Sequence, residues 1–154
     1  MSETILQVKN LKKYYMVGRK GLFGEKEYVK SVDGVSFTLH RGETLAIVGE
    51  SGCGKTTLGR TLIRLYNPTS GEILFNGKNI SGKLSKADRD YVTRNLSMIF
   101  QDPMTALNPL KKIGYHMIEV LRRHQNLSKA EARKVAIDML GKVGIPSAES
   151  RMDQ

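Results

Sequence analysis

Nine consecutive residues carry the clearest chemistry in the chain, and they read Gly49-Glu50-Ser51-Gly52-Cys53-Gly54-Lys55-Thr56-Thr57. The segment fits the pattern G-x-x-x-x-G-K-[ST], in which a loop wraps around phosphate groups. The glycines let the backbone turn tightly and bring successive N–H groups close to phosphate oxygens. Lys55 offers a compact positive charge to the β and γ phosphates, and the hydroxyl of Thr56 can coordinate Mg²⁺. The pattern predicts a nucleotide-phosphate site.

The elements on either side of this loop supply the context that the motif requires. The run from Thr44 to Val48 is continuously apolar, which predicts a strand buried on both faces of a parallel sheet. From Thr57 to Tyr66 the leucines recur at helical spacing, and Asn67-Pro68 should stop the helix. A helix that begins at the loop adds free amides and the positive end of its dipole.

Other segments predict an antiparallel flank to this core. Ile5 to Lys9 is a short β-rich run, and Val35 to Leu39 alternates apolar and polar residues. Met16 to Lys26 contains glycines among basic residues and predicts a loop or insertion. Glu72 to Phe75 followed by Asn76-Gly77 predicts a strand that enters a tight turn. The expected fold class is α/β.

The last third of the chain predicts helices. An apolar segment, Leu96 to Phe100, ends in Gln101-Asp102-Pro103. Ser128 and Glu131 form a capping box, in which each side chain satisfies a backbone amide at the start of a helix. Apolar residues then recur at helical spacing and predict one packing face of this helix. They are Ala132, Val135, Ala136, Met139, Leu140 and Val143. Gly144 and Pro146 mark the end of the helix.

Net charge, hydropathy and cysteine content limit the class of protein but do not identify its binding partner. The 154 residues include 25 Lys and Arg against 15 Asp and Glu, a net charge of +10, which favours anionic partners or a solvated surface. No apolar run is long enough to cross a bilayer, and the start lacks the pattern of a signal peptide, so we expect a cytoplasmic location. Cys53 is the single cysteine, and its place in the loop favours a filler role over catalysis.

The phosphate loop alone leaves several enzyme classes open, because GTPases and small-molecule kinases share it. No Asn-Lys-x-Asp segment for guanine recognition occurs in the chain. Five further segments narrow the choice. They are Ser31–Phe37, Arg41–Leu45, Val48–Lys55, Pro68–Ile73 and above all Met98-Ile99-Phe100-Gln101-Asp102-Pro103-Met104-Thr105-Ala106-Leu107-Asn108-Pro109. With these segments the chain resembles an ABC transporter nucleotide-binding domain over nearly its whole length, and specifically the oligopeptide and dipeptide importer branch. Nickel importers share much of the last segment.

The resemblance implies a P-loop NTPase (RecA-like) core with an N-terminal antiparallel β subdomain and the start of an α-helical subdomain. The β subdomain and the part of the P-loop core that is present would span residues 1–103, which end at the Q-loop. The start of the helical subdomain would span residues 104–154. Gln101 occupies the Q-loop position, where its amide would contact Mg²⁺ or the attacking water. Tyr15, with Tyr14 as the alternative, would stack on the adenine of ATP. The implied cofactors are ATP and Mg²⁺.

The same resemblance implies partners and a place in the cell. These are two transmembrane permease subunits, a second ABC ATPase subunit in a homo- or heterodimer, and an extracytoplasmic solute-binding protein, at the cytoplasmic face of the membrane. No nucleic acid is expected. Two rival functions stay open: a non-transport ABC ATPase acting on nucleic acid or ribosomes, and a degenerate module that binds nucleotide without turnover.

Several family motifs do not occur in the sequence. The Leu-Ser-Gly-Gly-Gln signature, the Walker B strand and the switch His are absent, and His40, His116 and His124 do not occupy the switch context. We therefore expect an N-terminal portion of an ABC ATPase domain with exposed apolar surface beside its P-loop strand, and weak or no ATPase activity for this polypeptide alone.

Overall fold

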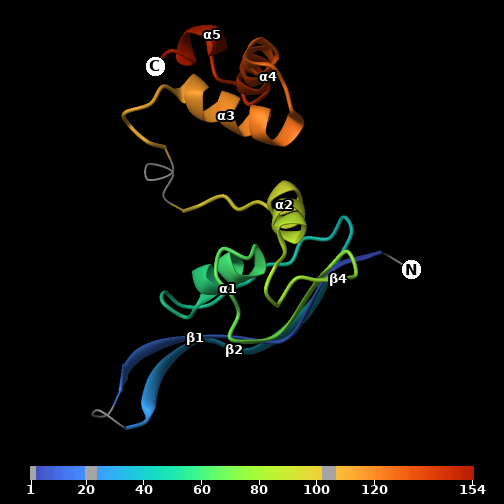
Figure 1. Ribbon diagram of the computed structural model, residues 1–154, viewed down its shortest axis with the longest axis vertical. Helices are drawn as coiled ribbons and strands as arrows, with labels where there is room; N and C mark the ends of the chain where they lie inside the picture. Colours follow the sequence, from blue (N-terminus) through green and yellow to red (C-terminus); the bar gives the residue numbers. More distant parts are fainter. Residues whose placement is uncertain (1–2, 20–23, 102–106) are drawn as a thin grey trace. The chain divides into compact units, whose positions relative to one another are not determined.

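A long antiparallel hairpin begins the chain in the computed structural model, which describes residues 3–19, 24–101 and 107–154. Its strands are β1 (Thr4–Arg19) and β2 (Lys26–His40), paired with Leu6 opposite Leu39 and Tyr15 opposite Val29. Figure 1 shows the hairpin extending well beyond the other strands. The expected loop over Met16 to Lys26 is wrong at both ends, because pairing across the hairpin extends to Arg19 and Lys26.

Two shorter strands complete a four-stranded antiparallel sheet in the order β2-β1-β3-β4. They are β3 (Ser70–Phe75), which pairs with β1, and β4 (Lys78–Asn79). Asn76 and Gly77 join them with φ angles of 48° and 75°. Both residue types tolerate that left-handed backbone, so the predicted tight turn after Phe75 is confirmed.

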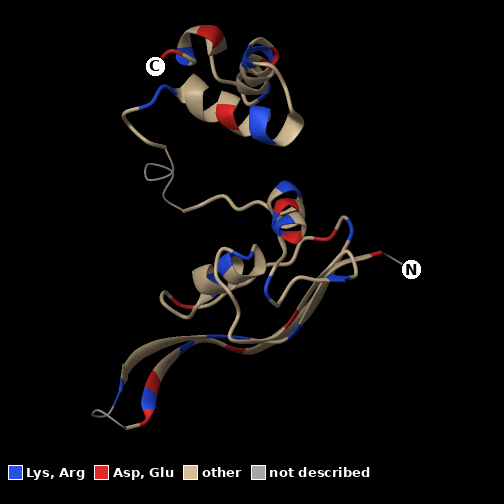
Figure 2. Ribbon diagram, viewed as in Figure 1, with Lys and Arg blue, Asp and Glu red and all other residues tan. Residues whose placement is uncertain are grey.

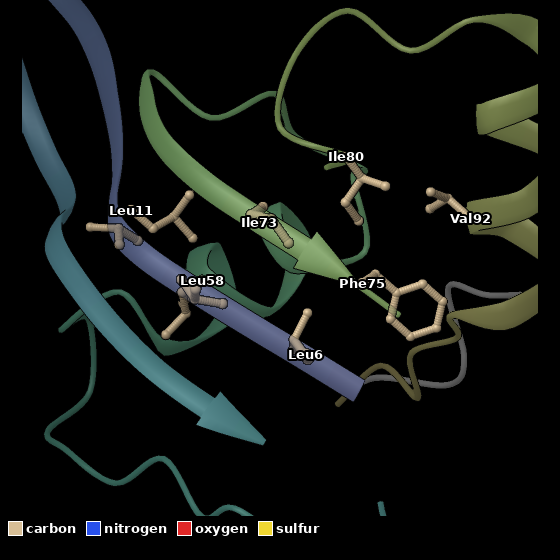
Figure 3. Close-up of a cluster of buried hydrophobic side chains, with 9 residues drawn as sticks. Leu6, Leu11, Leu58, Ile73, Phe75, Ile80 and Val92 are labelled. Carbon is tan, nitrogen blue, oxygen red and sulfur yellow. The ribbon is translucent and has the colours of Figure 1, made fainter. Parts of the chain in front are cut away.

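Helices α1 (Lys55–Leu62) and α2 (Lys86–Asn95) pack with the sheet around one apolar cluster (Figure 3). Leu58 comes from α1 and Val92 from α2, and Ile73 of β3 lies between them with no exposed surface. The other buried members are Leu6, Val8, Leu11, Val32, Phe75 and Ile80. The helix predicted over Thr57 to Tyr66 begins two residues earlier and ends at Leu62.

Helix α2 is an element that the sequence prediction missed. Ser85 caps it, accepting a hydrogen bond from the amide of Asp88, whose carboxylate accepts one from the Ser85 amide in return. This is a capping box with Asp in place of the more usual Glu or Gln. The local signal was therefore present at the right spacing.

The predicted strand from Thr44 to Val48 is wrong, because these residues adopt irregular backbone. No strand within the described residues pairs with them. Their side chains are exposed, 42 % for Leu45, 44 % for Ile47 and 88 % for Val48. A buried parallel strand requires hydrogen-bonded neighbours on both sides, which an apolar run cannot supply for itself. The expected exposed apolar surface beside the P-loop is confirmed.

The chain divides into two compact units, Met1–Met98 and Ile99–Gln154. The second contains α3 (Ile113–Gln125), α4 (Lys129–Lys142) and α5 (Ala148–Arg151). The predicted capping box of Ser128 and Glu131 is confirmed. Ala132 and Ala136 of the predicted apolar face are buried, whereas Met139 and Val143 are exposed. The expected boundary between 103 and 104 lies outside the described residues.

Charged residues of both signs occur throughout the described part of the chain. Lys and Arg are spread over both units, with Asp and Glu interspersed, as Figure 2 shows. Within the same ranges, no helix combines the length and apolar character that crossing a bilayer demands.

Candidate functional site

The loop between Thr44–Val48 and α1 contains two glycines, Gly49 and Gly54, at which a side chain would meet neighbouring atoms. Gly54 has a φ of 98°, and a Cβ atom there would lie 2.0 Å from the carbonyl oxygen of Ser31 on β2. A Cβ atom at Gly49 would lie 2.7 Å from the Sγ of Cys53. The loop is therefore compact, because Gly49 at its beginning packs against Cys53 and Gly54 near its end packs against β2.

Lys55 lies over this loop and is held by the loop's own carbonyl groups. Its Nζ donates to the carbonyl oxygens of Gly49 and Glu50, each at 2.7 Å, and lies 3.6 Å from the Sγ of Cys53. The ammonium group is thus fixed inside the curve of the backbone. A phosphate group held by the loop would meet this charge directly.

The start of α1 leaves backbone donors available beside Lys55. Its N-cap is Gly54, which has no side chain to accept a hydrogen bond, and its first turn contains no acidic residue. The amide of Leu58 bonds to the carbonyl of Gly54, so the amides before it belong to the uncapped first turn. An uncapped helix start with its positive dipole end suits an anion.

The remaining predicted loop residues present polar groups to solvent. Glu50, Ser51, Gly52, Cys53 and Thr56 are exposed, and Thr57 is partly buried. Cys53 is a free thiol. Within the described ranges, no three His, Cys, Asp or Glu side chains gather as a metal site would require. Thr56 stays the predicted Mg²⁺ ligand of this loop, through its hydroxyl.

The structure distinguishes the two tyrosines that were candidates for base stacking. Tyr14 donates a short hydrogen bond from its hydroxyl to Asp33, which raises the pKa of Tyr14 and lowers that of Asp33. Tyr15 is partly exposed, and its ring meets that of Tyr66 edge to face, with centroids 6.1 Å apart. The Nζ of Lys13 lies 4.8 Å from the Tyr15 centroid.

Tyr66 is a neighbour of Tyr15 that the sequence prediction missed. Its hydroxyl accepts a hydrogen bond of 3.0 Å from Arg60 on α1, so contacts run from α1 through Tyr66 to Tyr15. Tyr15 lies on β1 and Tyr66 in a bend after α1, and no spacing rule connects them. Only the packing of α1 on the sheet could reveal this contact.

Gln101, the predicted Q-loop residue, is exposed and lies in a bend of the second unit. The segment after it, Asp102 to Ala106, lies outside the described residues. The structure therefore describes the phosphate loop and Tyr15 within one unit and Gln101 within the other.

The family model and the similar proteins of known function agree on one protein family. The ABC transporter family model matches residues 32–153. An oligopeptide transport ATP-binding protein of Bacillus subtilis, AppF, is 48 % identical over 151 residues, covering 97 % of this chain and 46 % of the relative. The Escherichia coli dipeptide transport ATP-binding protein DppF is 43 % identical, covering 94 % of this chain and 43 % of the relative. The chain spans a little under half the length of these relatives.

Solved structures show the same fold class. The dimeric structure of a bacterial ABC transporter cassette, MJ0796, superposes with a TM-score of 0.80 at 23 % identity, covering 97 % of this chain and 61 % of the other. The cbiO1 protein of Clostridium perfringens, part of the ABC transporter complex cbiONQ, superposes with a TM-score of 0.67 at 27 % identity, covering 99 % of this chain and 54 % of the other. The antiparallel sheet and helices are thus those of an ABC ATPase cassette.

Proposed function

Because this chain belongs to the ABC transporter family, we propose that it is the ATP-binding part of an importer and holds the phosphates of ATP at residues 49–57. The observation that carries this proposal is the position of Lys55. Its Nζ is fixed 2.7 Å from two loop carbonyls, beside the uncapped start of α1. The positive charge of Lys55 thus lies beside the amides of an uncapped helix start, and both groups attract a phosphate.

Each loop residue has a task in this proposal. The ammonium of Lys55 exchanges its carbonyl partners at Gly49 and Glu50 for β and γ phosphate oxygens. The amides at the uncapped start of α1 donate to phosphate oxygens, and the glycines of the loop keep side chains away from them. Thr56 would hold Mg²⁺ through its hydroxyl, and the ion would supply positive charge against the charge that develops during phosphoryl transfer. Gln101, which the structure describes in the other unit, stays a predicted ligand of Mg²⁺.

Tyr15 is proposed to stack on the adenine. Tyr14 is less suited to this role, because Asp33 holds its hydroxyl. The contact from Tyr15 through Tyr66 to Arg60 connects the base-stacking ring to the same helix that begins at Lys55.

We propose that the intact protein hydrolyses ATP and that these 154 residues alone do so weakly or not at all. Phosphoryl transfer requires a positioned water and stabilisation of the transition state, beyond holding the phosphates. The sequence offers the cradle and, in Gln101, one candidate for positioning water. A solved relative in a post-hydrolysis state contains ADP and Pi, which supports hydrolysis for the family.

The proposed cargo is a peptide, either a dipeptide or an oligopeptide, or a related solute such as nickel. The names of the curated relatives support this cargo, since they are oligopeptide, dipeptide and di/tripeptide transport proteins. The proposed partners are two membrane permeases, a second ATPase subunit and an extracytoplasmic solute-binding protein. The chain would then lie at the cytoplasmic face of the membrane.

Binding is tested by titrating Mg-ATP into the chain by calorimetry and comparing Lys55→Ala. We expect saturable binding that this substitution weakens severely, whereas Lys86→Ala, an exposed lysine on α2, leaves it unchanged. ATP binding that is indifferent to Lys55→Ala would contradict the proposed site. Steady phosphate release by the purified chain, abolished by Lys55→Ala, would overturn the proposed inactivity of the chain alone.

The cargo is tested in cells that lack the gene. Uptake of a labelled dipeptide, a labelled pentapeptide and nickel is measured after restoring either the natural gene or its Lys55→Ala form. We expect peptide uptake to return with the natural gene only. Loss of nickel uptake alone would assign the protein to the nickel branch, and unchanged uptake of all three would reject the importer role.

A further inference from the structure

A cavity of about 530 Å³ in the first unit is lined by the segment that follows α1 and by the segment that leads into α2. Three lining residues, Arg64, Lys83 and Arg89, are positively charged, and no lining residue is acidic. The others are Asn67, Pro68, Ser81, Gly82 and Leu84. Its volume lies within the range of roughly 300–1,000 Å³ found for small-ligand sites.

Arg64 brings an uncompensated charge to this cavity. Its Nη2 donates to the Oδ1 of Asn67 at 3.1 Å and to the carbonyl oxygen of Gly82 at 2.8 Å, and both acceptors are neutral. Its Nε and Nη1 are shielded from solvent and donate no hydrogen bond within the described residues. A half-buried charge without a counter-ion is unfavourable, so these donors require an explanation such as a bound ion.

Arg89 places a second positive charge near that of Arg64 and therefore does not compensate it. Burial and the positive charge of Arg89 both lower the pKa of Arg64. The Nη2 of Arg89 donates only a long bond of 3.5 Å, to the carbonyl oxygen of Leu84. In the described part of the chain, neither arginine forms an ion pair with a carboxylate. A negative charge in the cavity would convert this repulsion into attraction.

The backbone of Arg64 provides an independent observation. Its φ is 62°, in the left-handed region that favours glycine or asparagine. The fold nevertheless keeps an arginine there and ties its side chain to the loop at Gly82. An unfavourable backbone conformation that is retained beside a charged cavity is consistent with a binding role for the side chain.

We propose that this cavity binds a phosphate-type oxyanion, either free or as the headgroup of a lipid. The exposed side chains of Arg89 and Lys83 contact the anion directly. The partly buried guanidinium of Arg64 contributes a further positive charge against the negative charge of the anion. The planar fork of an arginine matches two phosphate oxygens, and a lysine adds a point charge. The site shares no residue with the phosphate loop at 49–57 and goes beyond the proposed ATP site.

The test uses the full chain with Lys55→Ala, which removes the main cation of the phosphate loop. Inorganic phosphate is titrated by calorimetry at an ionic strength kept constant with chloride. We expect saturable binding that Arg89→Gln weakens about tenfold or more, the loss that follows from one charge-assisted contact. Arg94→Gln is the matched control, because Arg94 is an exposed arginine on the same helix.

A second arm identifies the source of the phosphate group. Sedimentation with phosphatidylcholine vesicles is compared with and without phosphatidic acid, for the same variants and for Arg64→Gln. Phosphate binding that depends on Arg89 supports a free anion, and binding to phosphatidic acid alone with the same dependence supports a lipid. If Arg64→Gln does not fold by circular dichroism, Arg89→Gln alone decides. No binding in either arm, or binding that Arg89→Gln leaves unchanged, overturns the proposal.

Discussion

Gly54 packs so closely on β2 that a Cβ atom at this position would lie 2.0 Å from the carbonyl oxygen of Ser31. The phosphate loop is therefore fixed to the antiparallel sheet by backbone contact, without a side chain between them. This contact explains how a hairpin far from the loop in sequence sets the position of the cradle. The fold therefore requires glycine at the second glycine of the motif, Gly54, apart from any contact with phosphate.

Gly54→Ala should destabilise the first unit and abolish nucleotide binding together. A left-handed backbone costs a residue with a Cβ about 1–2 kcal/mol, and overpacking against Ser31 adds about 1–3 kcal/mol. Urea unfolding and Mg-ATP titration measure the two effects. Gly52→Ala is the control, since a Cβ there meets nothing within 4 Å, although its φ is 82°. Equal destabilisation by both variants would contradict the role of the Ser31 contact.

Tyr15→Ala should weaken ATP binding through loss of base stacking. Stacking of one base on an aromatic ring contributes about 1–3 kcal/mol. Tripolyphosphate has no base, so its affinity should stay unchanged, and the comparison separates the base from the phosphates. Tyr14→Phe, which removes only the hydroxyl bonded to Asp33, should leave ATP binding intact. If the two substitutions had the reverse effects, Tyr14 would be the stacking residue.

Ile73→Ala should destabilise the first unit strongly, whereas Ile99→Ala should not destabilise the chain. Ile73 has no exposed surface and lies in the cluster between β1, β3 and the two helices, so its truncation leaves a cavity and costs about 2–5 kcal/mol. Ile99 is 97 % exposed. Denaturant unfolding of both variants provides the measurement. A cost for Ile99→Ala comparable to that for Ile73→Ala would show that its surface is covered.

Ser128→Ala should destabilise α4 by about 1 kcal/mol, the usual cost of losing an N-cap side chain. The Oγ of Ser128 accepts from the amide of Glu131, and the carboxylate of Glu131 accepts from the Ser128 amide in return. Amide hydrogen exchange in the first turn of α4 is the direct readout. Ser128→Thr should retain most of the protection, because threonine can cap in the same way. Unchanged exchange in Ser128→Ala would contradict the cap.

Acid should weaken the packing of α2 through Asp88. The side chain of Lys78, and then that of Ser85, hold the pKa of Asp88 below its ordinary value of 3.8. Because the folded pKa is depressed, this contribution to stability is complete above the unfolded value and is lost as pH falls through the folded value. Asp88→Asn should therefore reduce the fall in stability below pH 3.8. Asp90→Asn on the same helix is the control, and an identical acid dependence in Asp88→Asn would contradict the prediction.

Features decided by a few neighbouring residues could be predicted from the sequence. The capping box of Ser128 and Glu131 depends on two residues three positions apart, and the turn at Asn76-Gly77 depends on the freedom of two residues to adopt positive φ. The phosphate loop is of the same kind, because its glycines, lysine and threonine are consecutive. The Ser85 and Asp88 box was equally local, and α2 could have been predicted from it.

What only the tertiary structure decided involves partners far away in the chain. Thr44 to Val48 has the composition of a buried strand, yet its backbone is irregular, because a strand is defined by hydrogen bonds to neighbours. Residues 16–19 and 26 are strand because the hairpin continues to pair there. The sequence by itself predicted the phosphate loop, because its glycines, lysine and threonine are neighbours in the chain. The contacts of Gly54 with Ser31 and of Tyr15 with Tyr66 depend on long-range packing, which local sequence does not encode.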